Sequence, residues 1–582
     1  MNARHPVYTE KAECQDCYKC VRHCPVKAIE VRGGSATVMA ELCIACGHCV
    51  EVCPAGAKRV RDDVPAARQL LAGGARVAVS LAPSWLAEFP GLEPARLVAV
   101  LKRLGFWGVS ETALGAQEVS AGVAAALRDP TPRVLVSPAC PTVVELVAKY
   151  HPQLAAAVMP LCSPLLAHAR LLKQLYGQEL RVVFIGPCIG KKREADAHPE
   201  LVAVSLTFKE LRRWLEAEKL DPAQEPPGDG APFIPGPAEE GVLYPVDGGM
   251  IAGIRANCAV HAGDMMALSG VETIQGALHD LDPATLTGPL FLELLACAGG
   301  CVNGPCARTR DGTIAKRRAV LGQAAYPTAA IPRTAVVELG LEHPHPPPAP
   351  PPCTDEVKLR EVLARVGKRT VTDELNCGGC GYANCREFAA ALLVGKAEAT
   401  MCVSHMRQLA QKKANALIKT MPSGVVIVDQ ELRIVECNRR FARLAGADVT
   451  TAYDAKPGLE GVALDRVAPF LADGLRHVLA TGEELSNLTV RGNERVFTAS
   501  LFGIEPGRSA GGVLQDVTEP AMRRDQVVRR TRDVIRRNLA TVQQIAYLLG
   551  ENAAESQASL NEIITAFAAD PDAALTEDEE PS

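Results

Sequence analysis

The sequence has no stretch of about 18 uninterrupted apolar residues, the minimum for a membrane-spanning helix, so no membrane span is expected. Its start, Met1 to Glu13, has no apolar run, so we expect no secretory signal and a cytoplasmic protein. The net charge is only −5 over 582 residues. Nothing global therefore indicates binding to nucleic acid or to an anionic membrane surface.

Cysteine, by contrast, is abundant. There are 21 cysteines, and most of them lie in tight clusters along the chain. In a long chain without a secretory signal, clustered thiols are better explained as metal ligands or catalytic groups than as disulfides.

The length predicts three to five domains at about 100–200 residues each, and the patterning predicts a multidomain α/β and α+β protein. Its expected parts are a cysteine-rich domain (1–62), an α/β domain (75–340), a stiff Pro-rich linker (341–359), a short cysteine-bearing module (360–405), a small α+β domain (412–520), a helix (521–567) and an acidic tail (568–582).

The first 53 residues contain the pattern C-x2-C-x2-C-x3-C-P twice, which is the bacterial ferredoxin motif. In that motif three close thiolates hold one four-iron (4Fe–4S) cluster and the fourth crosses to the other cluster. We therefore assign one cluster to Cys14, Cys17, Cys20 and Cys53, and the other to Cys24, Cys43, Cys46 and Cys49. Two structural zinc sites are the alternative, which the doubled motif with its trailing prolines disfavours. Two adjacent clusters serve to move single electrons.

Three segments of the α/β domain share one design, a β-like run that ends in a loop carrying cysteine. The loops supply Cys140, Cys188, and the pair Cys297 and Cys301. Sites in open α/β sheets gather at the carboxyl ends of strands, so these four thiolates are expected to converge on one metal centre. Gly299 and Gly300 would let the backbone approach it closely. Scattered buried cysteines are the alternative, disfavoured because the loops match.

These loops resemble the three signature loops of the iron-only hydrogenases, over roughly Gly74 to Gly340. The resemblance implies a hydrogenase active-site cluster (H-cluster), a 4Fe–4S cluster joined to a two-iron subsite with carbon monoxide, cyanide and dithiolate ligands. It implies that Cys140, Cys188, Cys297 and Cys301 are ligands, that Cys301 bridges to the subsite, and that Lys191 hydrogen-bonds a cyanide. Ala82, Pro83 and Ser84 match a loop that packs against the subsite.

The chain departs from that family where protons move. Catalytic members carry a second cysteine before the first ligand, as proton donor and acceptor, and here that position is Ala139. The second loop has Gly186 in place of a methionine. Glu194 matches a relay acid, but its usual carboxylate partner is missing from Val119 to Ala124. General acid–base transfer contributes about 10²–10⁴-fold, so we expect slow turnover.

A further cysteine pattern, C-x2-C-x4-C-x16-C, resembles a single 4Fe–4S module of anaerobic redox proteins. Its expected ligands are Cys377, Cys380, Cys385 and Cys402, with one helical stretch running from Arg386 to Cys402. Zinc is the alternative, and an iron–sulfur cluster fits better in a chain that already carries electron-transfer clusters.

Residues Met421 to Phe441 predict a hairpin that ends in Asn438 and a helix, followed by three strand-like runs. This resembles a PAS sensor domain. We expect it to bind no cofactor, because it has no flavin-type cysteine motif and its single histidine, His477, is weak support for haem.

After Pro520 the helix repeats every seven residues, the pattern of a coiled coil with a polar Asn in the interface. The interface positions are Val528, Thr531, Ile535, Asn538, Val542, Ile545 and Leu549. Dimerisation and packing against the PAS domain both remain open. The arginines between 523 and 537 are better explained as a solvated face than as a docking surface.

The leading hypothesis is a hydrogen or redox sensor that reacts slowly with H2 and protons, without a kinase or phosphatase domain of its own. Its output would pass to a separate kinase, phosphatase or regulator. One alternative is a catalytic hydrogenase that exchanges electrons with a ferredoxin-like partner; another is an iron–sulfur scaffold without the two-iron subsite. Five cysteines receive no role: Cys162, Cys258, Cys306, Cys353 and Cys437.

Overall fold

The computed structural model describes residues 5–549 apart from 229–231, 259–263, 308–311, 325, 345 and 493. It divides into two compact units, Met1–Met406 and Arg407–Ser582. No helix in the described part of the chain is long and apolar enough to cross a membrane. The expected acidic tail and the residues of the C-terminal helix beyond 549 lie outside the described residues.

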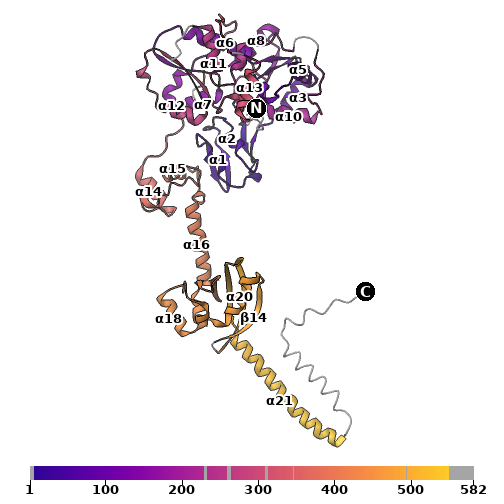
Figure 1. Cartoon of the computed structure of the whole chain (residues 1–582), viewed down its shortest axis with the longest axis vertical. Helices are drawn as coiled ribbons and strands as arrows, with labels where there is room; N and C mark the ends of the chain where they lie inside the picture. Colours follow the sequence, from indigo (N-terminus) through magenta and orange to yellow (C-terminus); the bar gives the residue numbers. More distant parts are fainter. Residues whose placement is uncertain are drawn as a thin grey trace. The chain divides into compact units, whose positions relative to one another are not determined.

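The N-terminal cysteine-rich domain has two pairs of short strands (Figure 1). Its elements are β1 (Val7–Thr9), α1 (Lys19–Arg22), β2 (Ile29–Arg32), β3 (Ser35–Val38), α2 (His48–Glu51) and β4 (Lys58–Val60). The two cysteine motifs lie between β1 and β2 and between β3 and β4. β1 pairs antiparallel with β4, and β2 pairs antiparallel with β3. With so little regular structure, a core this small needs bound clusters or neighbours for stability.

The central domain contains two parallel sheets, as the β-like runs and helical stretches predict. One sheet has the order β6-β5-β8-β9 and the other β10-β11-β7. The strands are β5 (Val77–Leu81), β6 (Gly108–Glu111), β7 (Arg133–Val136), β8 (Arg181–Gly186), β9 (Val204–Thr207), β10 (Met265–Ser269) and β11 (Pro289–Leu295). β5 and β11 are buried along their whole length, as expected of parallel strands covered on both faces.

Helices cover both sheets of this domain (Figure 1). They are α3 (Val64–Ala72), α4 (Trp85–Glu88), α5 (Pro94–Arg103), α6 (Ala113–Ala126), α7 (Pro141–Tyr150), α8 (Pro164–Tyr176), α9 (Gly190–Ala197), α10 (Phe208–Ala217), α11 (Gly249–Asn257), α12 (Val271–His279) and α13 (Thr313–Leu321). Three of them, α5, α7 and α8, begin at a proline, which has no N–H to leave unpaired in a first turn.

The Pro-rich segment is not a free spacer. The Ala349 backbone N–H donates to the Lys149 carbonyl at 2.8 Å, so the run is held against α7. The expected linker also ends early, because α14 (Glu356–Arg365) begins before residue 360, where Asp355 caps it.

The cysteine-bearing module does not contain the single helix expected up to Cys402. α15 (Cys385–Leu393) ends nine residues before that cysteine, at a turn through Gly395, whose φ is +71°. A short 3-10 turn, Ala399–Met401, then places Cys402 immediately before α16 (Val403–Thr420). The boundary between the two units falls within α16.

The second unit has an antiparallel sheet in the order β13-β12-β16-β15-β14, with helices after the first hairpin. Its elements are β12 (Gly424–Asp429), β13 (Ile434–Cys437), α17 (Arg439–Ala445), α18 (Ala447–Ala455), α19 (Leu464–Val467), α20 (Ala472–Thr481), β14 (Leu485–Gly492), β15 (Arg495–Glu505), β16 (Ser509–Asp516) and α21 (Thr518–Leu549). The hairpin ending in Asn438 is present as predicted.

Candidate active site and metal centres

Seven of the eight N-terminal cysteines fall into two groups, and one of these groups crosses between the two motifs. Burial raises the pKa of Cys49, and the thiolates of Cys46, Cys24 and Cys43 raise it further. Cys24, from the first motif, therefore lies beside the thiols of the second. Burial also raises the pKa of Cys20, and the thiolates of Cys14 and Cys17 raise it further. Cys53 lies in the loop after α2, and its place in the first cluster stays a prediction.

The four cysteines of the central domain follow three parallel strands. Cys140 follows β7, Cys188 follows β8, and Cys297 and Cys301 follow β11. Burial raises the pKa of Cys188 to about 12, and the Cys140 thiolate adds to that shift. Burial likewise raises the pKa of Cys301, and the thiolates of Cys140 and Cys188 raise it further. The structure thus brings all four thiols together, and the raised pKa values of Cys188, Cys297 and Cys301 mean that these three need a metal or another positive charge to persist as thiolates.

A cavity of about 100 Å³ lies beside these thiols. Its lining includes the predicted residues Ala82, Pro83, Ser84, Ala139, Cys140, Cys188, Lys191 and Cys301. Cys297 instead lines a neighbouring cavity together with Cys46. Cys306 lines neither of these two cavities and is buried. The predicted residues therefore surround one space from several loops.

Two glycines explain the close packing around this cavity. Gly300 has a φ of +96°, and a Cβ there would lie 2.3 Å from the Pro245 carbonyl oxygen, which brings the third loop against a cavity wall. A Cβ on Gly186 would lie 2.5 Å from the Phe184 ring and 2.9 Å from the Ala82 Cβ. The Phe184 ring thus occupies the room that a larger residue at 186 would require.

Lys191 faces the cavity and is engaged by three oxygen atoms. Its ammonium donates to Ser163 Oγ at 2.9 Å, to the Ala139 carbonyl at 3.4 Å and to Glu194 Oε2 at 2.7 Å. Glu194 is therefore a partner of Lys191 and does not line the cavity. Its role as a proton relay stays a prediction.

The proton-carrying groups expected of a fast enzyme are not gathered here. The lining of this cavity, in the described residues, contains no carboxylate and no histidine. α6, which includes Val119 to Ala124, turns small buried side chains toward the core. Its one carboxylate, Glu118, accepts hydrogen bonds from the backbone N–H groups of Val336 and Val337.

The second ferredoxin motif packs directly against the central site. Gly47 has a φ of +84°, and a Cβ there would lie 2.5 Å from Pro305 and 2.8 Å from Ile189, the residue after Cys188. Lys149 and Arg193 both donate to the Cys43 carbonyl, at 3.0 and 2.9 Å. These contacts hold one predicted cluster site beside the next.

The cysteine-bearing module packs against the other half of the ferredoxin-like domain. A Cβ on Gly381 would lie 3.0 Å from Val21, which is part of α1. Lys27 donates to the Gly381 carbonyl at 2.9 Å, and the Val31 N–H donates to the Lys396 carbonyl at 2.9 Å. Cys380, Cys385 and Cys402 lie close together, since burial raises the pKa of Cys380 and the other two thiolates add to the shift. Cys377 is exposed.

In the second unit Asn438 joins three elements. Its Oδ1 accepts from the N–H groups of Phe441 and Val425, which caps α17. Its Nδ2 donates to the carbonyls of Ile418, in α16, and Ser423, both at 2.9 Å. Cys437 is buried and donates to the Gly458 carbonyl, as a packed side chain does.

Sequence reasoning missed several cavity-lining residues. Thr112, Tyr244 and Pro245 reach the site from segments without cysteine, and Phe184 lies in β8, four residues before Cys188. Thr112 belongs to a buried hydrogen-bonded chain in which Ser80 contacts both Thr112 and His168, at 2.7 Å each. No local pattern marks these positions, because their contacts depend on how distant strands align.

The residues present fit the groups that the cysteine patterns imply. Ser84 lines the cavity, is 2% exposed, and its hydroxyl has no partner among the described residues, as expected for a donor to a bound ligand. In the described part of the chain, no three His, Cys, Asp or Glu side chains are grouped closely enough to hold a single metal ion. Cys140, Cys188, Cys297 and Cys301 would hold the cluster, with Lys191 and Ser84 as donors to its ligands.

Comparison with known proteins agrees with this arrangement. Residues 75–305 match the model of the iron-only hydrogenase large subunit, C-terminal domain. Residues 6–54 match a 4Fe–4S dicluster domain, 373–404 match an Fe–S cluster model, and 413–484 match a PAS domain.

Individual relatives are distant. The NADP-reducing hydrogenase subunit HndD of Solidesulfovibrio fructosivorans is 25% identical over 360 residues, which cover 50% of this chain and 61% of that protein. An uncharacterized ferredoxin of Methanocaldococcus jannaschii is 37% identical over 49 residues, 8% of this chain and 79% of that protein. A variant FeFe-hydrogenase structure from Chlamydomonas reinhardtii has 21% identity and a TM-score of 0.38, and covers 47% of this chain and 91% of that one.

These matches define a multidomain iron–sulfur protein with a ferredoxin-type dicluster domain, an iron-only hydrogenase large-subunit domain and a further Fe–S module. The chain is an FeFe-hydrogenase-like protein that also carries a PAS domain. It spans about 61% of the length of the hydrogenase subunit it matches.

Proposed function

We propose that this protein is a sensory hydrogenase, which reacts slowly with H2 and passes the redox change through iron–sulfur clusters to its PAS domain. The observation that carries the proposal is Ala139. This residue lines the cavity beside Cys140, at the position where catalytic members of the resembling family place a proton-carrying thiol. A methyl group there can hold no proton.

The remaining ionisable groups of the lining are poor substitutes for that thiol. Burial raises the pKa of Tyr244 far above its ordinary value, and its hydroxyl is hydrogen-bonded to Ser120. Lys191 is held in an ion pair with Glu194. Proton exchange is then left to water, which favours slow reaction. The H-cluster would supply the chemistry of H2. The chain's own residues would hold that cluster and limit how fast protons reach it.

The placement of the other cysteine groups supports an electron route from this site. The Cys43 loop is hydrogen-bonded to the central domain through Lys149 and Arg193. The module contacts α1 of the ferredoxin-like domain, and Cys402 directly precedes α16. A change of charge at Cys402 would therefore arise at the start of a helix that ends beside Asn438.

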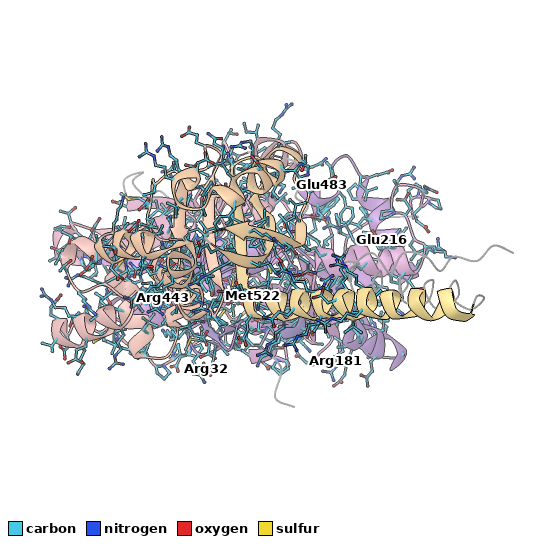
Figure 2. All side chains as sticks on the ribbon, turned by 90° about the horizontal axis from the view of Figure 1, so that it is seen from below. Arg32, Arg181, Glu216, Arg443, Glu483 and Met522 are labelled. Atoms are coloured by element: carbon cyan, nitrogen blue, oxygen red, sulfur yellow. The ribbon has the colours of Figure 1, made fainter. Side chains whose placement is uncertain are left out.

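Output through a separate regulator, and dimerisation through α21, belong to the same proposal. The described predicted interface positions Val528, Thr531 and Ile535 are less exposed than the residues around them, while Met522, Val527 and Val534 are exposed apolar side chains on the same helix (Figure 2 labels Met522). Light scattering on the full chain tests this part, and a monomer at all concentrations would contradict it.

The first experiment is infrared spectroscopy of the anaerobically matured full chain, with and without H2. Carbon monoxide and cyanide bands that shift under H2, together with slow turnover, are expected. Fast turnover would favour the ferredoxin-linked enzyme. Iron and sulfide without such bands, after maturation with the complete assembly machinery, would leave only an electron-transfer or scaffold protein.

A further inference from the structure

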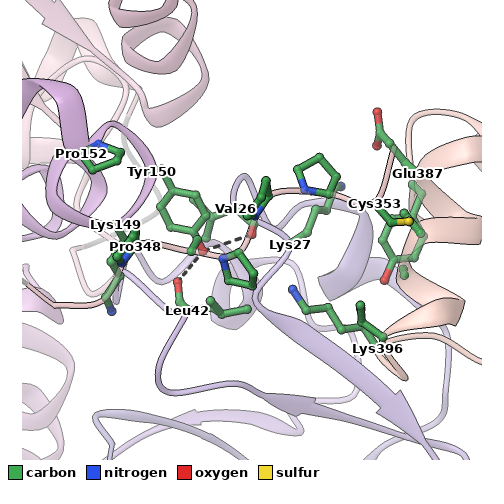
Figure 3. Close-up of a pocket in the computed structure, with 18 residues that line it drawn as sticks. Val26, Lys27, Leu42, Lys149, Tyr150, Pro152, Pro348, Cys353, Glu387 and Lys396 are labelled. Carbon is green, nitrogen blue, oxygen red and sulfur yellow. Dashed lines mark hydrogen bonds between the residues drawn. The ribbon is translucent and has the colours of Figure 1, made fainter. Parts of the chain in front are cut away.

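A second, larger cavity lies away from the candidate active site. Its volume is about 500 Å³, within the range of about 300–1,000 Å³ typical of small-molecule sites. Four parts of the first unit meet there: the ferredoxin-like domain, the C-terminal end of α7, the Pro-rich segment and the module (Figure 3).

The walls of this cavity are mostly apolar. The run Pro348 to Pro352 forms one side, held in place by the hydrogen bond from Ala349 to the Lys149 carbonyl. Ala390 and Ala391, on α15, contribute small side chains from the module. Proline has no backbone N–H, so this part of the wall offers contact surface and few polar groups.

Three lysines line the cavity, and two of them are already engaged. Lys27 donates to the carbonyls of Val21, Arg22 and Gly381. Lys149 donates to the Cys43 carbonyl and pairs with Glu145 at 2.7 Å. The Lys396 ammonium has no hydrogen bond or ion pair to any residue that the structure describes, and it points toward the space between the walls (Figure 3).

A buried tyrosine supplies a second unused donor. Tyr382 lines the cavity and is only 4% exposed, yet its hydroxyl has no partner in the described residues. The other tyrosine of the lining, Tyr150, donates to the Leu42 carbonyl at 2.7 Å (dashed in Figure 3). A buried hydroxyl without a partner is costly, so an occupant that accepts from Tyr382 would stabilise the protein.

We propose that this cavity binds a small organic anion. Its apolar body would lie against the prolines and the alanines of α15, and its acidic group, a carboxylate, sulfonate or phosphate, would accept from Lys396 Nζ and Tyr382 Oη. The module supplies both donors, while the facing wall belongs to α7 and the ferredoxin-like domain. Such a ligand therefore strengthens the contact between the module and the Pro-rich segment. The proposal does not depend on a reaction with H2.

The test is equilibrium dialysis of the full, cluster-loaded chain under anaerobic conditions with two probes. One is 8-anilinonaphthalene-1-sulfonate, and the other is N-phenyl-1-naphthylamine, which has the same rings without the acid. We expect one sulfonate probe per chain. Lys396→Met should weaken it about tenfold or more, since a charge-assisted hydrogen bond is lost, and leave the neutral probe unchanged.

Three further variants complete the experiment. Tyr382→Phe should weaken the sulfonate probe severalfold. Val394→Trp, at an exposed lining position, should exclude both probes. Lys413→Met, on the exposed surface of α16, is the matched charge control and should change neither. Iron content and circular dichroism verify that each variant is folded and loaded.

The alternative outcomes overturn the proposal. Absence of binding would refute it directly. Sulfonate binding that persists in Lys396→Met or Val394→Trp would place the probe elsewhere. Equal loss of both probes in Lys396→Met would show that the lysine supports the fold and does not contact the ligand.

Discussion

The candidate active site has two sides that differ in how closely they follow the iron-only hydrogenase pattern. On the metal-binding side, all four predicted ligand cysteines come together at the ends of parallel strands, and Lys191 and Ser84 face the same cavity. On the proton side, Ala139 replaces a thiol, Phe184 packs over Gly186, and α6 offers no acid to the cavity. The predicted ligand positions and the predicted proton-carrying positions therefore differ in how far they keep the family pattern within one fold.

The largest effect should come from breaking the metal-binding side. Cys301→Ser should abolish the carbon monoxide and cyanide infrared bands and any reaction with H2, because the thiolate predicted to bridge to the two-iron subsite is lost. Cys17→Ser is the matched control: this exposed cysteine is a predicted ligand of an N-terminal cluster, so the bands should remain while iron content falls. Normal bands in Cys301→Ser would contradict the ligand assignment.

The next effect tests the proton side. Ala139→Cys should raise H2 turnover by about 10²-fold or more, the usual contribution of a positioned acid–base group. Ala139→Ser, which adds a hydroxyl of high pKa, should give much less. An unchanged rate in Ala139→Cys, at equal infrared band intensity, would show that another step limits turnover.

Lys192, the residue after Lys191, sharpens the same comparison. It does not line the cavity, so we expect its loss to affect stability. Lys192 is fully buried and binds Asp63 at 2.7 Å and Glu210 at 2.9 Å. Lys192→Met would leave the buried Glu210 carboxylate without its cation and Asp63 with Arg61 alone, at a cost of about 3–5 kcal/mol in the free energy of unfolding. Anaerobic guanidinium denaturation measures it, with the exposed Lys102→Met as control. A loss below about 1 kcal/mol would contradict the account.

The smallest effect concerns the buried chain behind Thr112. Burial lowers the pKa of His168 to about 3, well below its ordinary value of 6.5. The unfolded chain therefore binds a proton that the folded chain does not, and stability should fall as pH drops below about 6.5. Between pH 7 and 5.5 the loss should be about 1 kcal/mol relative to His168→Gln. Parallel pH dependences of the two proteins would refute this.

Much of the site could be predicted because its cysteines lie in local sequence motifs. Cysteine spacing predicts the ferredoxin-type ligands, and the β-branched runs before Cys140 and Cys188 predict strands that end at these cysteines. The structure places the two strands, β7 and β8, in different sheets. Gly299 and Gly300 predict that the third loop approaches its neighbours closely. The residue that it approaches, Pro245, is seen only in the structure.

What could not be predicted depends on contacts between distant segments. Thr112 and Tyr244 carry no signal of their own, because they reach the cavity only when β6 and the 3-10 turn Glu240–Leu243, which directly precede them, are brought beside β5 and β8. The Pro-rich segment was expected to be a spacer, because its composition gives stiffness but not the hydrogen bond from Ala349 that docks it. The end of α15 at Leu393 was missed, since helix propensity outweighed the single Gly395 that stops it.

The helix α16 has a mechanical consequence. None of its described side chains is buried over 18 residues, a length of about 27 Å at about 1.5 Å per residue. A helix without a packed face is held mainly by its own backbone hydrogen bonds. Those bonds join its turns into one continuous element from Val403 to Thr420. No loop therefore interrupts the chain between Cys402 and the Ile418 carbonyl, to which Asn438 Nδ2 donates.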